Sequence, residues 1–112
     1  MVSNELMSMS AWQLAHSIRN KKLSPIEVTA YFLDRIKINN SSLNAFITVA
    51  EEEAKINAAE AESRIMSGGI VGPLHGVPIS IKDLSATKGL RTTLGTLLSK
   101  NWIPDYDDIP VE

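Results

Sequence analysis

No cysteine occurs among the 112 residues of the sequence. This absence excludes a disulfide framework, a thiolate nucleophile and a cysteine-ligated zinc site, and it fits a reducing compartment. An excess of charge of one sign is missing as well, because the formal net charge is −2 and no dense basic patch occurs. The sequence therefore predicts a protein that binds neither nucleic acid directly nor an anionic membrane surface by charge.

Long apolar runs are missing too, since none approaches the ~18 residues that a membrane-spanning helix requires. The opening residues, "MVSNELMSMS", contain no basic region leading into an apolar stretch, so they do not have the pattern of a signal peptide. A chain of this length is expected to form one domain at most. Together these absences predict a cytoplasmic protein with no membrane partner.

The sequence also offers little that would hold a cofactor. Glycines cluster in residues 68–76, but they match neither the dinucleotide fingerprint nor the P-loop spacing. His16 and His75 are the only histidines, and no cluster of further ligands accompanies either of them. We therefore expect no nucleotide, no metal and no other cofactor, and we interpret the glycines as turn residues.

Capping signals and helical periodicity predict three helices in the first part of the chain. Ser10 followed by Gln13 forms a capping-box pattern. The stretch "SPIE" marks a second helix start, and "NNSS" is expected to end that helix. The glycines of "SGG" are expected to end a third helix, rich in alanine and glutamate. The predicted helices span residues 11–20, 25–38 and 50–66.

Two segments have the patterns of strands. Residues 44–49, "NAFITV", alternate and predict a short strand or an extended link. Residues 77–82 follow a loop rich in glycine and proline and predict a second strand that ends at Lys82. Further along, "TTLGTLLSKNW" predicts a short helix, and Asp108 before Pro110 predicts the N-cap of another.

The stretch "GPLHGVPISIKD" presents one lysine, Lys82, after the uncharged residues 73–81, with His75 taken as neutral. On a strand, the Lys82 side chain would share a face with Pro78 and Ser80. The residues alone leave two interpretations open. Lys82 is either a strand-end lysine whose ammonium group stays in water, or a reactive amine in a dry setting.

The longer segment "GPLHGVPISIKDLSATKGLRTT" resembles the lysine segment of the amidase signature family. Upstream, "LSPIEVTAYFLDRI" and "LNAFITV" resemble the N-terminal helices and link of that family, and "IPDYDDIPVE" resembles the stretch that leads into its next helix. The resemblance extends from about Ala11 to Glu112. One departure is Thr96, which stands where many members have serine.

The resemblance implies an α/β fold, with N-terminal helices and the first strands of a mixed-sheet amidase that is incomplete in this chain. Residues 1–112 would be the N-terminal part of one amidase domain, with a helical region at about 10–69 and a lysine-bearing strand with loops at about 70–112. Members hydrolyse or transfer linear amides with a lysine, a serine held by a cis peptide, and a nucleophilic serine. Lys82 would be the lysine and the general base. Both serines belong to a glycine- and serine-rich segment that this sequence lacks, so we expect an amidase fragment that is inactive alone.

The chemistry explains why such an enzyme needs an amine. A serine that attacks an amide loses its proton as it does so, and a neutral amine can accept that proton and return it to the leaving amine. A lysine in water has a pKa of about 10.4, so only about one in 2,500 is neutral at pH 7. Because burial disfavours the charged form, the apolar run before Lys82 is expected to place the amine in a dry setting beneath the rest of a folded domain.

Three functions stay open on these residues. The chain is part of a stand-alone amidase acting on a small-molecule amide, part of the A subunit of the glutamyl-tRNA(Gln) amidotransferase, or a non-catalytic helical module that binds another chain. The amidotransferase subunit liberates ammonia from glutamine and needs partner subunits. The partners would accordingly be the amide substrate with a second copy of the chain, or the amidotransferase subunits. The segment "DLSATKGLRTTLGT" is slightly more similar to stand-alone amidases.

Overall fold

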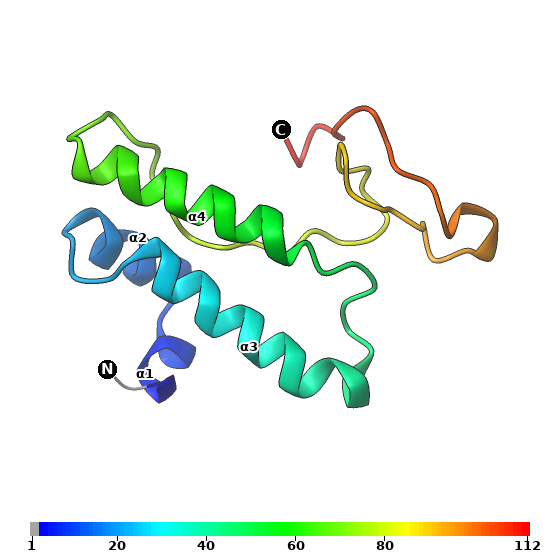
Figure 1. The fold of residues 1–112 in the computed structure, drawn as a ribbon, viewed down its shortest axis with the longest axis horizontal. Coiled ribbons are helices and arrows are strands. Elements are labelled where there is room, and N and C mark those ends of the chain that lie inside the picture. The colour runs from blue at the N-terminus through cyan, green and yellow to red at the C-terminus, as the bar shows by residue number, and fades with distance from the viewer. Residues whose placement is uncertain (1–2) are drawn as a thin grey trace. The chain divides into compact units, whose positions relative to one another are not determined.

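The computed structural model describes residues 3–112, and the elements in this range are helices. They are α1 (Ser3–Ser8), α2 (Ala11–Arg19), α3 (Pro25–Leu43), α4 (Glu51–Met66) and the 3₁₀-helix η1 (Leu97–Ser99) (Figure 1). The chain divides into two compact units. The first contains the residues up to Leu43 together with Glu51–Pro78, and the second contains Asn44–Ala50 together with Ile79–Glu112. No helix within residues 3–112 is long and apolar enough to cross a membrane.

The first unit is a helical assembly with an apolar core. Helices α3 and α4 lie side by side (Figure 1). The buried core consists of Leu14 and Ile18 of α2, Val28 of α3 and Ile65 of α4. Leu6 of α1 and Met9, just after it, pack against this core. Helix α1 was not predicted, because its short sequence carries no capping signal. Each longer helix buries one face, as its periodicity predicts.

The predicted starts of α2 and α3 are confirmed. Ser10 Oγ accepts a hydrogen bond from Gln13 N at 3.2 Å, and Gln13 Oε1 accepts one from Ser10 N at 2.7 Å, which completes the capping box. Ser24 Oγ accepts from Ile26 N at 3.1 Å, and Pro25 occupies the first helical position. Local sequence signals thus fix both starts.

The predicted end of the second helix at Ile38 is wrong, because α3 continues through "NNSSL". Asn39 and Ser42 of this stretch bond back to carbonyl groups of the preceding turn, a contact that these side chains can make inside a helix as well as at its end. Asn39 Nδ2 donates to Arg35 O at 2.8 Å, and Ser42 Oγ donates to Asn39 O at 3.0 Å. The helix ends before Asn44, whose φ of 51° lies in the left-handed region.

The third predicted helix is confirmed as α4, which begins one residue later than expected. Its end follows the glycines, as predicted. Gly68 has a φ of 75°, and its N–H donates to Ile65 O at 3.1 Å. Gly69 N donates to Arg64 O at 3.0 Å. These bonds satisfy the last carbonyl groups of the helix.

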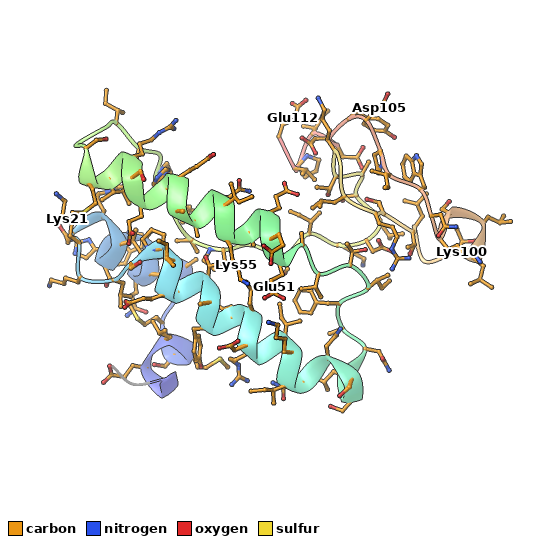
Figure 2. All side chains as sticks on the ribbon, in the orientation of Figure 1. Lys21, Glu51, Lys55, Lys100, Asp105 and Glu112 are labelled. Atoms are coloured by element: carbon orange, nitrogen blue, oxygen red, sulfur yellow. The ribbon has the colours of Figure 1, made fainter. Side chains whose placement is uncertain are left out.

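A cluster of charges connects α3 to α4. Glu51 Oε1 lies 2.7 Å from Nζ of both Lys37 on α3 and Lys55 on α4. Figure 2 shows Glu51 and Lys55 together on α4. The hydrogen bond from Lys37, followed by that from Lys55, lowers the pKa of Glu51 to about 2. Because both lysine side chains are about half exposed, the cluster contributes little stability.

Residues 77–82 do not form the predicted strand, and of the two alternatives predicted for residues 44–49 the structure has the link, so the expectation of first strands of a mixed sheet is corrected. Within residues 3–112 the backbone contains no β-strand. Residues 44–49 form an irregular link, in which Thr48 Oγ1 donates to Arg91 O at 2.9 Å and Arg91 Nη2 donates to Ile47 O at 3.2 Å. Residues 77–82 are also irregular. A strand is stable only when it pairs with others, and neither segment finds a partner strand in the part of the chain that the structure describes.

The second unit is built from irregular segments that flank η1 and run in opposite directions. Gly89 N donates to Pro104 O at 2.9 Å, and Thr92 N donates to Trp102 O at 3.0 Å. The short helix predicted in "TTLGTLLSKNW" is confirmed as η1. The unit therefore holds its shape through hydrogen bonds between residues that are distant in the sequence.

Asp108 takes part in this pairing through its side chain and its backbone. Its carboxylate Oδ2 accepts from Ala86 N at 2.7 Å, and its own N–H donates to Ala86 O at 2.9 Å. The carbonyl of Asp108 accepts from Val111 N at 2.7 Å, which forms a turn. Glu112 N also donates to Asp108 O at 3.3 Å, the bond from residue i+4 to residue i that opens a helix. The Asp108 carboxylate itself is occupied by a backbone N–H of another segment, and the helix expected after it stays a prediction.

Candidate active site

The loop "GPLHGVP", residues 72–78, is fixed onto the helices of the first unit. Gly76 has a φ of 82°, and a Cβ at this position would lie 3.0 Å from Pro25 Cγ and 3.1 Å from Ile18 Cγ2. Both the backbone conformation and the close packing therefore require glycine. The loop touches the buried core at this point.

Two polar contacts hold the same loop. Arg19 Nη2 donates to Gly72 O at 3.1 Å. His75 Nε2 lies 3.0 Å from Ala61 O on α4 and donates to that carbonyl. The glycines and prolines of this stretch thus fix where the chain leaves the first unit, four residues before Lys82.

Lys82 lies in the second unit with its side chain exposed. Its carbonyl accepts a hydrogen bond from Ser85 N at 2.9 Å, which closes a turn. No residue described in the structure, serines included, forms a hydrogen bond or ion pair with the amine of Lys82. The dry setting expected for this amine is therefore not formed by residues 3–112.

Asp83 follows Lys82 directly, and the loop of residues 93–95 donates hydrogen bonds to it. Oδ1 accepts from Thr93 N at 2.8 Å, while Oδ2 accepts from Thr93 Oγ1 and from Gly95 N, the latter at 3.4 Å. The carbonyl of Asp83 accepts from Leu94 N at 3.1 Å. We refer to these four bonds as the Asp83 clamp.

The clamp favours the ionised form of the Asp83 carboxylate. Partial burial acts to raise the pKa of Asp83, but the hydrogen bonds from Thr93 and Gly95, with the positive charge of Arg91, outweigh this effect and lower the pKa. Thr93 itself is buried. The backbone on the carboxyl side of Lys82 is therefore held by a charged group that several donors satisfy.

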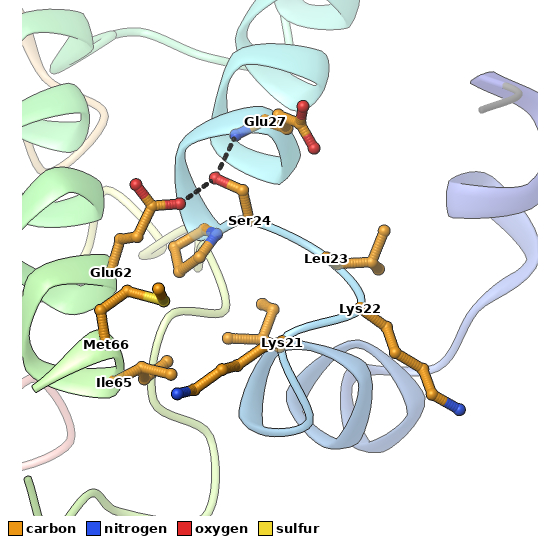
Figure 3. Close-up of a pocket in the computed structure, with 10 residues that line it drawn as sticks. Lys21, Lys22, Leu23, Ser24, Glu27, Glu62, Ile65 and Met66 are labelled. Atoms are coloured by element: carbon orange, nitrogen blue, oxygen red, sulfur yellow. Dashed lines mark hydrogen bonds between the residues drawn. The ribbon is translucent and has the colours of Figure 1, made fainter. Parts of the chain in front are cut away.

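A surface pocket of about 230 Å³ lies in the first unit and does not include Lys82. Figure 3 shows Ser24 and Glu62 lining it, with Lys22 pointing away. The Ser24 hydroxyl donates to Glu62 Oε1 at 2.5 Å and accepts from Ile26 N. A serine engaged in this way at a helix start caps the helix.

The sequence singled out Lys82 but not the residues of the Asp83 clamp. The sequence features that belong to the clamp are a carboxylate next to the lysine and the stretch "TTLG" about ten residues further on. No local pattern links two such segments, because their pairing depends on how the loop between them closes.

Residues 27–112 match the family model described as Amidase. The chain is 40% identical over 107 residues to the A subunit of the glutamyl-tRNA(Gln) amidotransferase of Geobacter sp. (strain M21), and the match covers 96% of this chain and 22% of that protein. The corresponding protein of Trichlorobacter lovleyi is 40% identical over 103 residues, covering 92% of this chain and 21% of that protein.

Among solved structures, the chain is similar to a bacterial aryl acylamidase that belongs to the amidase signature enzymes. The TM-score is 0.77 and the identity is 38%, over 83% of this chain and 19% of that one. The chain thus spans about a fifth of the length of the relatives that it matches.

Proposed function

The chain belongs to the amidase family, and on that premise we propose that it is the lysine-bearing part of a longer amidase that hydrolyses linear carboxamides. Lys82 is the general base in this proposal. The observation that carries it is the exposed amine of Lys82, which stands without a described partner on a backbone held by the Asp83 clamp. This amine lies inside the segment that matches the family.

The proposed reaction is acyl transfer through a serine. A nucleophilic serine attacks the amide carbonyl, and its proton passes through a second, bridging serine to the amine of Lys82. The same proton then moves to the nitrogen of the leaving amine, and water releases the acyl group. Both serines are supplied from outside residues 1–112, so we expect no hydrolysis by the chain alone.

The surface of the second unit supports the proposal that further protein covers it. Its nearly bare apolar side chains are Ile79 (83% exposed), Leu97 (85%), Leu98 (97%) and Ile109 (87%). Exposed apolar groups in this number are typical of a surface that packs against other protein. Such a cover would also exclude water from the amine of Lys82 and favour the neutral form that a general base requires.

The two kinds of relative support two different classes of substrate. The structural relative is an aryl acylamidase, which supports a stand-alone amidase. The curated relatives named above are amidotransferase A subunits, which support a chain that works with partner subunits. The segments that match are shared by both, so the substrate has to be determined by assay.

The experiment places the full chain, residues 1–112, in the aryl acylamidase in place of its matching stretch. We refer to this fusion as the amidase chimera. We expect it to hydrolyse an aryl acylamide, measured by release of the aromatic amine. Lys82→Ala is expected to lower kcat roughly 10³-fold, the middle of the range for loss of a general base. A second chimera, built on the Geobacter amidotransferase with all of its subunits present, tests glutamine as substrate.

Lys88→Ala is the matched control, because Lys88 is an exposed lysine of the same unit. It is expected to keep kcat within about threefold of the unmutated chimera. A folded Lys82→Ala chimera with full activity would contradict the proposal, and so would a folded chimera without any activity. Hydrolysis by the purified chain alone that disappears in Lys82→Ala would show that no outside serine is needed.

A further inference from the structure

The Asp83 clamp holds a strained turn next to the candidate general base. Leu94 has a φ of 54° and Gly95 a φ of 70°, so two consecutive residues lie in the left-handed region. Glycine adopts this conformation freely, but leucine does so at a cost. Backbone strain of this kind persists only where the surroundings enforce it, and it clusters at functional sites. Here Asp83 accepts from the N–H groups of both residues.

The clamp also controls the backbone from which the Lys82 side chain extends. The carbonyl of Lys82 is held by Ser85 N, and the next residue is held by both its carboxylate and its carbonyl. The amine itself has no described partner that would orient it. The backbone therefore sets the point from which the side chain extends, and the clamp sets the backbone.

We propose that Asp83 is a positioning residue for Lys82, which aims the amine by tying its backbone to the loop of residues 93–95. This inference rests on the proposed function of Lys82 as general base. Asp83 does not touch the substrate in this account. It acts because a general base has to lie within hydrogen-bond reach of the proton that it removes.

The role requires a carboxylate and not only a side chain of the same shape. Three donors, Thr93 N, Thr93 Oγ1 and Gly95 N, converge on the two oxygens of Asp83. Asparagine has one acceptor oxygen, and its amide N–H₂ would face a donor. Asp83→Asn therefore breaks part of the clamp while the volume of the side chain stays almost constant.

The test measures kcat, KM and the melting temperature of variants of the amidase chimera. Asp83→Asn is expected to lower kcat by about 10- to 100-fold with KM unchanged, as for a reacting group displaced by a fraction of an ångström to 1 Å. Thr93→Val removes one donor and is expected to lower kcat in the same direction by a smaller factor. Thr93→Ser keeps the hydroxyl and is expected to recover most of the activity that Thr93→Val loses.

Asp108→Asn is the matched control for a merely structural effect. The carboxylate of Asp108 lies in the same unit and also accepts a backbone N–H, that of Ala86, but it takes no part in the clamp. We expect Asp108→Asn to lower the melting temperature as much as Asp83→Asn does. Its kcat, measured well below melting, should stay within about threefold of the unmutated chimera.

The outcomes separate this inference from the proposed function. If Lys82→Ala abolishes activity while Asp83→Asn keeps kcat within threefold, the positioning role is wrong and the proposed function stands. Equal losses of kcat in Asp83→Asn and Asp108→Asn would also overturn it, because both would then act through stability. Full activity of Lys82→Ala would contradict the proposed function itself. If Asp83→Asn does not fold, equal kcat values for Thr93→Val and Thr93→Ser would overturn the positioning role.

Discussion

In the first unit the most deeply buried side chains are Ile18 and Val28, whereas the buried positions of the second unit include Thr92 and Thr93. The first unit packs helices around apolar groups. Both units leave large apolar groups exposed, but the buried positions of the second unit include Ala86 and hydrogen-bonded threonines such as Thr92, with no large apolar side chain among them. One polypeptide thus contains two ways of holding a backbone in place.

This difference teaches what each unit can do without the rest of a longer protein. A helical unit satisfies its own backbone and needs only one apolar face covered. The second unit has few apolar contacts of its own and depends on the hydrogen bonds made by the carboxylates of Asp83 and Asp108. We therefore expect apolar substitutions to weaken the first unit and changes in carboxylate charge to weaken the second.

The largest effect that tests this difference between the units is expected at Ile18. Ile18→Ala in the full chain should lower the free energy of unfolding by about 2–5 kcal/mol, because the residue is 1% exposed and leaves a cavity. Urea unfolding followed by far-UV circular dichroism measures this, since the described α-helices all lie in the first unit. The control is Ile38→Ala, a side chain 75% exposed. Equal losses in the two variants would mean that the first unit has no apolar core.

The loop that leads from the first unit toward Lys82 can be tested at Gly76. Gly76→Ala should cost about 1–3 kcal/mol, because the new Cβ is strained at positive φ and meets Pro25 and Ile18. Gly68→Ala is the matched control, with a φ of 75° but nothing within 4 Å of the added Cβ. The difference between the two variants in urea unfolding isolates the contact with the core. No difference would mean that the loop is not packed there.

The second unit should be sensitive to acid through Asp83. The pKa of Asp83 is lowered in the folded chain from its ordinary value of 3.8, so the unfolded chain binds the proton more readily. The stabilisation is therefore fully present above about pH 4 and is lost as the pH falls through the lowered, folded pKa. Fluorescence of Trp102 in a Trp12→Phe background follows this unit as the pH is reduced.

Asp83→Asn should remove much of that acid dependence, because the clamp no longer contains a group that titrates. Asp105→Asn, at an exposed carboxylate of the same unit, should leave it unchanged. The same acid transition in all three proteins would contradict the assignment of Asp83 as the group responsible.

The smallest effect is expected at the charge cluster of the first unit. The pKa of Glu51 is about 2 in the folded chain, so its contribution is present above about pH 4.5 and disappears as the pH approaches 2. Glu51→Gln should lower the melting temperature only slightly at low salt, and about 1 M salt should erase the difference by screening. Glu53→Gln, on the exposed first turn of α4, is the control. A large loss of melting temperature that does not depend on salt would mean that charge interactions contribute strongly to the stability of the first unit.

The same contrast explains what could be predicted from the sequence. Ser10 with Gln13 and Pro25 after Ser24 are local signals, and they predicted two helix starts correctly. The continuation of α3 was missed because asparagine and serine can end a helix or bond back into it, and here Asn39 bonds back.

The second unit was less predictable because its contacts are not local. The run before Lys82 has the composition of a strand, but a strand also needs a partner, which composition does not supply. Lys82 was singled out through the family resemblance and the setting of "GPLHGVPISIKD". The bonds from Asp83 to Thr93 and from Asp108 to Ala86 join residues 10 and 22 apart, and no periodicity records such pairs.

Whether the amine at position 82 performs the chemistry can be measured by removing it and building it back. The chain has no cysteine, so Lys82→Cys introduces its single thiol. Alkylation with 2-bromoethylamine then restores an amine at nearly the original length, whereas iodoacetamide adds a neutral amide. Lys88→Cys is treated with the same reagents to detect effects of alkylation elsewhere in the amidase chimera. We predict that Lys82→Cys is inactive, that aminoethylation returns a substantial part of kcat, and that iodoacetamide returns none. Full activity of Lys82→Cys before alkylation, or equal recovery with both reagents, would contradict the role of Lys82 as the general base.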